Sequence, residues 1–279
     1  MLRNAMTIDV EDYFQVSAFA RHIKREDWPH LPCRVEQNID LILSLLQDHQ
    51  THATFFTLGW IAQRYPKVVQ RIIECGHELA SHGFHHYRAT EQTPEAFRED
   101  IRSSKALLED LSGHAVRGYR APSFSIGAGN LWALDLLHEE GYQYSSSIYP
   151  IQHDHYGMPE APRFRFYPRG VQGILEIPAT TATLFGRHVP AAGGGYFRLI
   201  PYPVSRWLMQ RINHHDGEPC IFYFHPWELD PHQPRQTGIS AKTRFRHYVN
   251  LSRMHGKIGA LLKDFEWDRV DRVFLEPVK

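Results

Sequence analysis

Cysteine is scarce in this sequence, and the few thiols that occur are scattered. Cys33, Cys75 and Cys220 are the only three, and no two of them form a CxxC pair. An odd, dispersed set argues against a disulfide framework and against a zinc site built from thiolates. We therefore expect these residues to be small apolar members of the core.

Long apolar runs are missing as well. No stretch of the sequence approaches the roughly 20 consecutive apolar residues that a helix needs to cross a bilayer. The N-terminal MLRNAMTIDV also lacks the apolar segment of a secretory leader. These two absences predict a protein without a transmembrane segment that is located in the cytoplasm.

A surplus of charge of one sign is also missing. Lys and Arg together number 31, and Asp and Glu together number 31, among 279 residues. Proteins that bind nucleic acid or an anionic membrane usually carry a face of one sign, so neither partner is expected. The sequence carries no signal for an oligomeric state.

What the sequence does contain is an alternation of short apolar runs with helix-period segments. The strand-like runs are AMTIDV (5–10), ATFFTLG (53–59), HELASH (77–82), VRGYRAP (116–122), YQYSS (142–146), GILEIPA (173–179) and CIFYFH (220–225). Helical periodicity occupies 35–49, 66–75, 94–112, 130–140 and 203–214. This alternation indicates parallel strands covered by helices. Seven strands, one fewer than in a regular barrel, predict an α/β fold, a distorted seven-stranded (β/α) barrel.

The expected domain organisation is one barrel with an elaboration. We assign residues 1–230 to the barrel and residues 231–279 to a helical extension packed on its outside. The stretch 150–172 is rich in Pro, His and aromatic residues without periodicity. It is expected to be a long loop over one end of the barrel, and such loops are often functional.

Residues with reactive side chains stand at the ends of several predicted strands. They are Asp9 and Glu11, His82, Arg120, Glu176 and His225. The C-terminal ends of all strands of a parallel barrel open on one face, where the active sites of such barrels lie. The sequence therefore predicts that residues more than 200 positions apart converge on one cleft.

Three carboxylates in TIDVEDYF and two histidines in SHGFHH form a candidate metal site. Strand alternation puts Asp9 and Glu11 on the same side, whereas Asp12 could instead cap a helix or turn. His82 and His86 can both reach one ion if the chain turns after Gly83. Two imidazoles and a carboxylate suit a divalent Lewis acid. Zinc is the default for this set, and cobalt, nickel or iron fit it too.

Together these segments resemble the polysaccharide deacetylases of carbohydrate esterase family 4, which have the NodB-homology fold. The resemblance rests on the acidic cluster after the first strand, on SHGFHH, YRAPSF and FYFH, and on ATFFTLGW. It covers roughly residues 5–226 in order. More narrowly, TIDVEDYFQVSAF, GGGYFRLIPY and FYFHPWELDP are similar to deacetylases encoded in exopolysaccharide loci with PEP-CTERM/exosortase systems.

The resemblance implies hydrolysis of N-acetyl groups on a polysaccharide or oligosaccharide, with release of acetate, in exopolysaccharide biosynthesis. It implies a divalent ion on His82, His86 and Glu11, with Asp12 as the alternative to Glu11. Asp9 is the expected base, oriented by Arg120, and His225 the expected general acid. The backbone N–H of Ser123 is the expected oxyanion donor. The expected substrate contacts are Phe124, Trp227, Phe222 and Glu176.

Three positions depart from the family pattern. Gly83 replaces a Ser or Thr, Phe222 replaces a Leu, and Ser145 stands where an Asp is expected. The departures keep open a non-catalytic carbohydrate-binding homologue as an alternative. A second alternative is an amide hydrolase of small molecules on the same fold, which a short, closed loop 150–172 would favour.

Overall fold

The computed structural model describes residues 2–153 and 157–275. Its centre is a curled sheet in which every strand pair is parallel. The strands of this sheet are β1 (Arg3–Val10), β2 (Thr54–Thr57), β3 (Glu78–Ser81), β4 (Gly118–Tyr119), β5 (Tyr144–Ser145), β6 (Leu175–Glu176), β9 (Ile221–Phe224) and β10 (Glu266–Asp268). Six of them lie within predicted runs, and β1 overlaps the run 5–10 and begins two residues before it. The predicted fold class is therefore confirmed.

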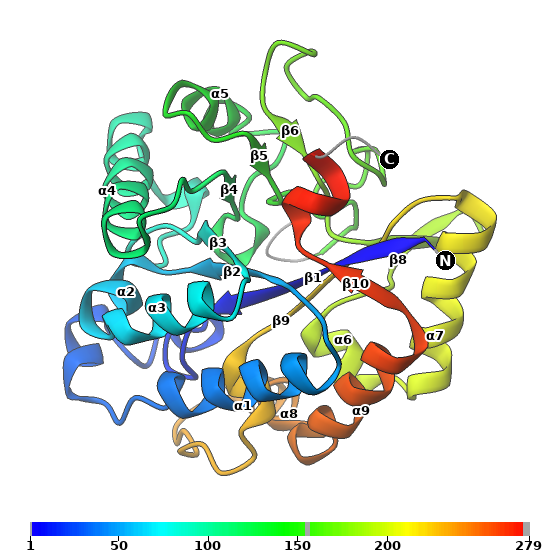
Figure 1. The fold of residues 1–279 in the computed structure, drawn as a ribbon. Helices are drawn as coiled ribbons and strands as arrows, with labels where there is room; N and C mark the ends of the chain where they lie inside the picture. The colour runs from blue at the N-terminus through cyan, green and yellow to red at the C-terminus, as the bar shows by residue number, and fades with distance from the viewer. Residues whose placement is uncertain (1, 154–156, 276–279) are drawn as a thin grey trace.

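β1 is the central strand, and three other strands pair with it (Figure 1). β2 pairs with residues 7–10 of β1, β9 with residues 5–8 and β10 with residues 3–5. All of β1 except Arg3 is buried, as expected for a strand covered on both faces. The pairing continues from β2 through β3, β4 and β5 to β6, and the barrel is open between β6 and β9.

Helices surround this sheet as the alternating pattern predicts. They are α1 (Val35–Asp48), α2 (Gly59–Arg64), α3 (Pro66–Glu74), α4 (Pro94–Ser112), α5 (Trp132–Glu139), α6 (Gly194–Leu199), α7 (Tyr202–Arg211), α8 (Ala241–Tyr248) and α9 (Leu251–Asp264). One apolar cluster joins β1, β2 and β9 to α1, α7 and α9, and a second joins β3 and β4 to α4 and α5. Burial of each large apolar side chain in them contributes roughly 1.5–3 kcal/mol.

The ends of α4 illustrate how local sequence sets an element. The Thr93 side chain accepts a hydrogen bond from the Ala96 N–H at 3.2 Å, and Pro94 occupies the first turn. Gly113 follows the helix with φ of 68°, a left-handed conformation that glycine adopts without a Cβ penalty. Thr93-Pro94 and Gly113 therefore fix both ends, as predicted.

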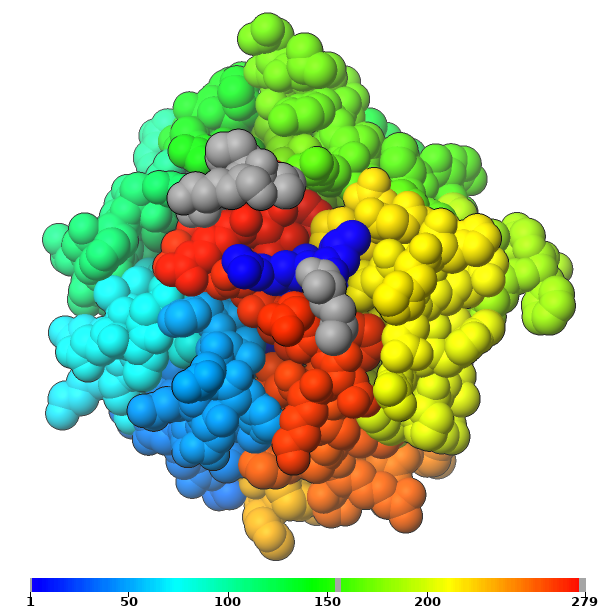
Figure 2. All heavy atoms as spheres, turned by 45° about the vertical axis from the view of Figure 1, so that its right-hand side comes forward, coloured from blue at the N-terminus to red at the C-terminus, as the bar shows by residue number. Residues whose placement is uncertain are grey.

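The C-terminal segment does more than cover the barrel. The predicted helical stretch is divided into α8 and α9 at Asn250, which has φ of 53°. The chain then returns through β10 to pair with β1, and Figure 2 shows the red C-terminal segment against the blue N-terminal strand. β10 was not predicted. The domain boundary at residue 230 remains a prediction.

Two further elements were not anticipated. α2 begins at Gly59, at the end of the predicted strand 53–59, where a Cβ would lie 2.6 Å from the Phe84 ring. A separate antiparallel hairpin joins β7 (Thr181–Leu184) to β8 (Arg187–Pro190). In the described part of the chain, no helix is both long and apolar enough to cross a membrane.

Candidate active site

The C-terminal ends of four strands bring the predicted polar residues together. Asp9 lies in β1 and Glu11 directly after it, and His82, Arg120 and His225 each follow the last residue of β3, β4 or β9. All of these side chains are buried or nearly so; His225, at 19% exposure, is the most accessible. The predicted convergence on one end of the barrel is therefore what the structure shows.

Glu11, His82 and His86 form a compact group of metal-ligand type. One ligand atom from each lies within 4.8 Å of the others, and all three side chains are buried. His82 Nδ1 lies 2.8 Å from the Arg120 carbonyl oxygen. Donation of the Nδ1 proton to that carbonyl leaves Nε2 as a lone-pair donor. Burial lowers the pKa of His82 to about 4, so this ring is neutral at pH 7.

The carboxylate of Glu11 is the centre of this group. Its Oε2 lies 2.7 Å from His86 Nε2, and its Oε1 accepts a hydrogen bond from Trp227 Nε1 at 3.3 Å. Burial alone raises the pKa of Glu11, but the adjacent His86 and His225 outweigh it and hold the pKa at about 2. His86 is the one close contact of Oε2 among the described residues. A buried carboxylate beside the imidazoles of His82 and His86 fits a cation.

Asp12 is not brought to this group. Its carboxylate faces the start of α1, where Oδ2 accepts hydrogen bonds from the Val35 N–H at 3.0 Å and from the Arg34 N–H. Oδ1 accepts a third from the Tyr13 N–H at 2.7 Å. Asp12 therefore neutralises the N-terminal end of α1, which is the capping alternative considered above.

Asp9 is fixed by Arg120. Arg120 Nη1 donates to Asp9 Oδ1 at 2.6 Å and to Thr7 Oγ1 at 2.8 Å. On its other side the guanidinium donates from Nε to the Ser146 carbonyl at 3.1 Å and from Nη2 to Ser146 Oγ at 3.0 Å. With this many partners, the buried ion pair holds the Asp9 carboxylate in one orientation.

His225 lies beside the group formed by Glu11, His82 and His86. Its Nε2 is 3.5 Å from Glu11 Oε1 and 3.9 Å from Asp9 Oδ2. Its Nδ1 is 3.6 Å from Glu228 Oε2. Burial lowers the pKa of His225, but Glu11, Glu228 and Asp9 together raise it to about 9. The imidazole is thus a proton donor near neutral pH.

Glu228 is a residue that the sequence did not single out. It is buried, pairs with Arg198 Nε at 3.0 Å, and accepts a hydrogen bond from the His225 N–H at 3.2 Å. A Cβ at Gly194 would lie 2.0 Å from Glu228 Oε2, so the glycine run in AAGGGYFR makes room for this carboxylate. The only sequence signal was an acid three residues after His225.

Trp227 connects the site to the C-terminal segment. Its indole stacks on the His225 ring at 5.3 Å and 20°, and on the His247 ring of α8 at 4.2 Å and 12°. Burial lowers the pKa of His247 to about 3, so it serves as a neutral stacking partner. His247 Nε2 lies 2.7 Å from Gln233 Oε1, which fixes the ring.

The loop after β4 has an unusual backbone. Ser123 and Phe124 in this loop have φ of 57° and 50°. His86, in the loop after β3, has a similar φ of 56°. Left-handed non-glycine residues cost about 1–3 kcal/mol each and concentrate at functional sites. The loop is held by Ser147 Oγ, which accepts from the Ala121 N–H at 2.9 Å, and by Ser17 Oγ, 2.6 Å from Ser123 Oγ.

Of the four predicted substrate contacts, only Trp227 is among the described residues that line the open cleft presented below. Phe124 is buried against Tyr149 and Tyr223 and does not line it. Phe222 is fully buried in the core against Phe197. Glu176 is also fully buried, and its Oε1 accepts hydrogen bonds from the Ser147 and Ile148 N–H groups at 2.8 Å each.

The structure therefore does not bring Phe124, Phe222 or Glu176 to the lining of the cleft. Phe222 points away from the site because strand alternation sends it to the helix-covered face of β9. Glu176 instead stabilises the loop 145–147 through the two hydrogen bonds to its Oε1. Ser146 of this loop accepts hydrogen bonds from Arg120.

Two departures from the family pattern have structural reasons. Gly83 has φ of 75°, and a Cβ there would lie 2.7 Å from Asp100 Oδ2, so a Ser or Thr does not fit this backbone. Ser145 Oγ donates to Ser147 Oγ at 2.8 Å, so it supports the loop that holds Ala121.

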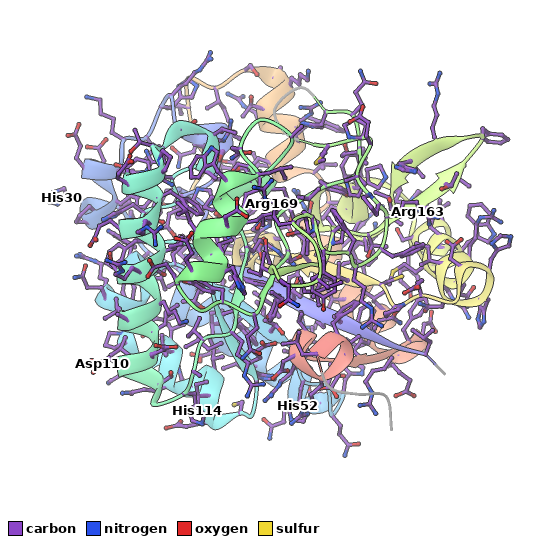
Figure 3. All side chains as sticks on the ribbon, turned by 90° about the horizontal axis from the view of Figure 1, so that it is seen from above. His30, His52, Asp110, His114, Arg163 and Arg169 are labelled. Atoms are coloured by element: carbon purple, nitrogen blue, oxygen red, sulfur yellow. The ribbon has the colours of Figure 1, made fainter. Side chains whose placement is uncertain are left out.

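An open cleft of about 920 Å³ adjoins these residues, and His86, Ser123 and Trp227 contribute to its lining. None of the described part of the loop 150–172 lines it. Other histidines lie elsewhere: Figure 3 shows His30, His52 and His114 at the edge of the molecule.

Comparisons with known proteins find two family models that match consecutive parts of the chain. Residues 26–145 match the family model described as "Polysaccharide deacetylase", and residues 146–275 match the one described as "Domain of unknown function (DUF3473)". The first match contains His82, His86 and Arg120, and the second contains His225. Asp9 and Glu11 precede both matches, and the fold brings them to the others.

Curated relatives match over shorter stretches. The chain is 33% identical over 95 residues to a peptidoglycan-N-acetylglucosamine deacetylase of Bacillus cereus, which is 34% of each protein. It is 30% identical over 101 residues, 36% of this chain, to a chitooligosaccharide deacetylase of Azorhizobium caulinodans. The match covers 34% of the first relative and 47% of the second, less than half of either.

Solved structures show the same fold over nearly the whole chain. A Mycobacterium smegmatis protein assigned to the polysaccharide deacetylases aligns with a TM-score of 0.60 at 18% identity, covering 98% of this chain and 88% of that one. A CE4 family pseudoenzyme from Bacillus anthracis aligns with a TM-score of 0.51 at 12% identity, covering 97% and 64%.

These findings show the fold and a likeness in sequence. The fold is that of the CE4 deacetylases, and residues 26–145, less than half of the chain, are similar to the polysaccharide deacetylases. The two curated relatives are deacetylases of peptidoglycan N-acetylglucosamine and of chitooligosaccharides.

Proposed function

We propose that this protein is a metal-dependent N-deacetylase that removes acetyl groups from an N-acetylated polysaccharide or oligosaccharide. The observation that carries the proposal is the placement of Glu11, His82 and His86 within 4.8 Å of one another, beside the Asp9–Arg120 pair and opposite His225. The identity of relatives as deacetylases of peptidoglycan and chitooligosaccharides supports it.

His82, His86 and Glu11 are the residues that would hold the ion. Two imidazoles and one carboxylate suit zinc best, and the buried Glu11 carboxylate would balance part of its charge. A divalent ion there supplies Lewis acidity, which acidifies water and polarises the amide carbonyl.

The chain's own residues would move the protons. Asp9 takes the proton of the attacking water, and Arg120 orients it through the 2.6 Å hydrogen bond. His225, held by Glu228, donates a proton to the departing nitrogen so that a neutral amine leaves. The Ser123 N–H stabilises the developing oxyanion, and the products are acetate and a free amine on the sugar.

The test is acetate release from N-acetylglucosamine oligomers by the zinc-loaded protein. Asp9→Asn and His225→Ala should each lose about 100-fold or more in kcat, with the native fold and the metal content retained. The unfolding midpoint of Asp9→Asn should fall, because Arg120 loses its buried partner. His138→Ala, on α5, is a matched control. Wild-type turnover by either variant removes that residue from the mechanism.

Two outcomes separate the alternatives. Bound metal and oligosaccharide without acetate release identify a non-catalytic binding homologue. Hydrolysis of small acetamides with no preference for oligomers identifies a small-molecule amide hydrolase. The open cleft of about 920 Å³ favours an oligomer.

Two finer parts of the proposal rest on the sequence likeness alone. They are an exopolysaccharide as the natural substrate and the place of the chain in the exosortase-associated subfamily.

A further inference from the structure

The cleft beside the candidate active site differs in charge from the protein as a whole. Its walls come from the segment between Phe14 and Trp28, from residues 86–91, and from α8 with its cap. Six cationic side chains line it: Arg21, Lys24, Arg25, Arg88, Lys242 and Arg246. Glu91 is the one carboxylate among its lining residues, although Lys and Arg equal Asp and Glu over the whole sequence, 31 against 31.

Most of these cations are not neutralised by the protein. Lys24 forms an ion pair with Glu26 at 3.2 Å. Among the described residues, no carboxylate lies within the 4.0 Å of an ion pair for the other five. Elsewhere, by contrast, Arg98 and Arg102 share Glu140. Charge left unpaired along a cleft attracts a ligand of opposite sign.

The acidic residues of the active site do not cancel this charge. The buried Asp9 carboxylate pairs with Arg120, with Oδ1 2.6 Å from Nη1. The buried Glu11 carboxylate contacts His86, with Oε2 2.7 Å from Nε2. Neither of them lines the cleft. A cation held by Glu11, His82 and His86 would add positive charge beside the cleft, which His86 lines.

Arg25 places one of these charges next to the active site. It donates from Nε to the His85 carbonyl at 2.7 Å and from Nη2 to the His86 carbonyl at 2.9 Å. Its guanidinium also lies 3.8 Å from the Tyr87 ring centroid. Carbonyls and a ring hold the guanidinium in place without removing its charge.

The opposite wall comes from α8. Lys242 and Arg246 are four residues apart, so they lie on one face of this helix, and both line the cleft. Arg244 lies between them and does not line it. His247 on the same helix stacks on Trp227, which fixes the position of α8 relative to His225.

Building on the proposed function, we infer that the substrate is an anionic glycan. Its N-acetylated unit occupies the metal end of the cleft, and carboxylate or phosphate groups on neighbouring units bind Arg21, Arg88, Lys242 and Arg246. The anion comes either from uronic acid units of the glycan or from a diphosphate link to a carrier. Both sources present the oxygen anions that guanidinium and ammonium groups bind.

Binding to the zinc-loaded Asp9→Asn protein tests this inference independently of turnover. Three probes are compared by calorimetry: a neutral N-acetylglucosamine tetramer, a tetramer alternating N-acetylglucosamine with glucuronic acid, and N-acetylglucosamine linked to a nucleoside diphosphate. We expect an anionic probe to bind at least about tenfold more tightly than the neutral tetramer. That advantage should shrink when salt rises from roughly 50 to 500 mM.

The triple variant R88Q/K242Q/R246Q in the same background should lose about tenfold in affinity for the anionic probe, with no change for the neutral one. R244Q, on the same helix but outside the cleft, should keep full affinity. Preference for the glucuronate tetramer assigns a uronic acid, and preference for the nucleotide sugar assigns a diphosphate. Equal affinity for all three probes, or an unaffected triple variant, overturns the inference.

The two proposals fail in different ways. Acetate release by the Asp9-containing protein from the neutral and anionic tetramers alike, with equal kcat/KM, supports the proposed deacetylation and refutes the anionic substrate. Selective binding of an anionic probe without acetate release refutes the deacetylation and leaves the charged cleft as a binding site.

Discussion

Arg120 and Asp9 are 111 residues apart in the chain, and the Nη1 of one donates to the Oδ1 of the other at 2.6 Å. Both side chains are nearly free of solvent contact. The pair joins the ends of β4 and β1, so it contributes both to the stability of the barrel and to the orientation of the expected base.

Removing the cation should cost stability as well as activity. Arg120→Met leaves Asp9 as a buried, unpaired charge, which costs about 3–5 kcal/mol in such pairs. Urea denaturation measures this loss. Arg169→Met, which breaks an exposed pair with Asp135, should leave the unfolding free energy unchanged. Equal effects of the two substitutions would show that the Asp9 site is hydrated and the pair weak.

Metal content should depend on His82 and not on its neighbour His85. His82→Ala removes an imidazole from the group with Glu11 and His86, and bound zinc after dialysis should fall by about tenfold or more. His85 is exposed and outside this group, so His85→Ala should keep one equivalent. Elemental analysis gives both values. Stoichiometric zinc in His82→Ala means that the ligands are elsewhere.

Glu228 should act as a positioning residue through His225. Glu228→Gln keeps the shape of the side chain but removes the negative charge 3.6 Å from His225 Nδ1. We expect kcat to fall by about 10–100-fold with KM changed less than twofold, and with metal content retained. Glu228→Asp should restore part of kcat. A loss in KM alone would assign Glu228 to substrate binding.

Gly83 should not tolerate the Ser or Thr of the family pattern. Gly83→Ala places a Cβ 2.7 Å from Asp100 Oδ2 at a φ of 75°, so we expect about 1–3 kcal/mol of destabilisation. Adding Asp100→Ala to that variant removes the contact and leaves only the backbone strain. Thermal unfolding of both variants separates the two contributions, and a neutral Gly83→Ala contradicts this explanation.

Stability should fall as pH rises past the normal range of a carboxyl group, because of Glu176. Burial raises the pKa of Glu176 from 4.5 to about 7. Between these values the folded protein holds a proton that the unfolded chain has released, so each rise in pH favours unfolding. The loss, on the order of 3 kcal/mol, is complete above pH 7 and absent below pH 4.5.

Glu176→Gln checks this directly, because Gln retains an oxygen to accept from the Ser147 and Ile148 N–H groups. The difference in unfolding free energy between pH 5 and pH 8 should be smaller in this variant. Glu95→Gln, at an exposed position, should follow the wild type. An unchanged pH difference in Glu176→Gln would mean that Glu176 titrates normally.

Much of the site could be predicted because its residues end parallel strands. Asp9, His82, Arg120 and His225 follow from that rule and from the order of the chain. The choice between Glu11 and Asp12 followed in part from strand alternation. What decided the position of Asp12 was the start of α1 at Val35, a contact across 23 residues that no local pattern reveals.

Other features depend on contacts that sequence spacing does not encode. Glu228 contacts His225 within one turn, but its burial beside Gly194 and its ion pair with Arg198, both of α6, could not be read from spacing. The cleft cations come from segments more than 200 residues apart, and each alone reads as a solvent-exposed charge. β10 is three residues long, too short for periodicity, and its pairing with β1 is set by where α9 ends.

The pairing of β1 with β9 and β10 bears on how the chain is made. Residues 3–8 leave the ribosome well before their partners, residues 221–224 and 266–268. At a synthesis rate of about 5–20 residues per second, the apolar edge of β1 waits on the order of tens of seconds for them. During that interval the nascent strand is open to aggregation, and a chaperone that shields it would raise the yield of native protein.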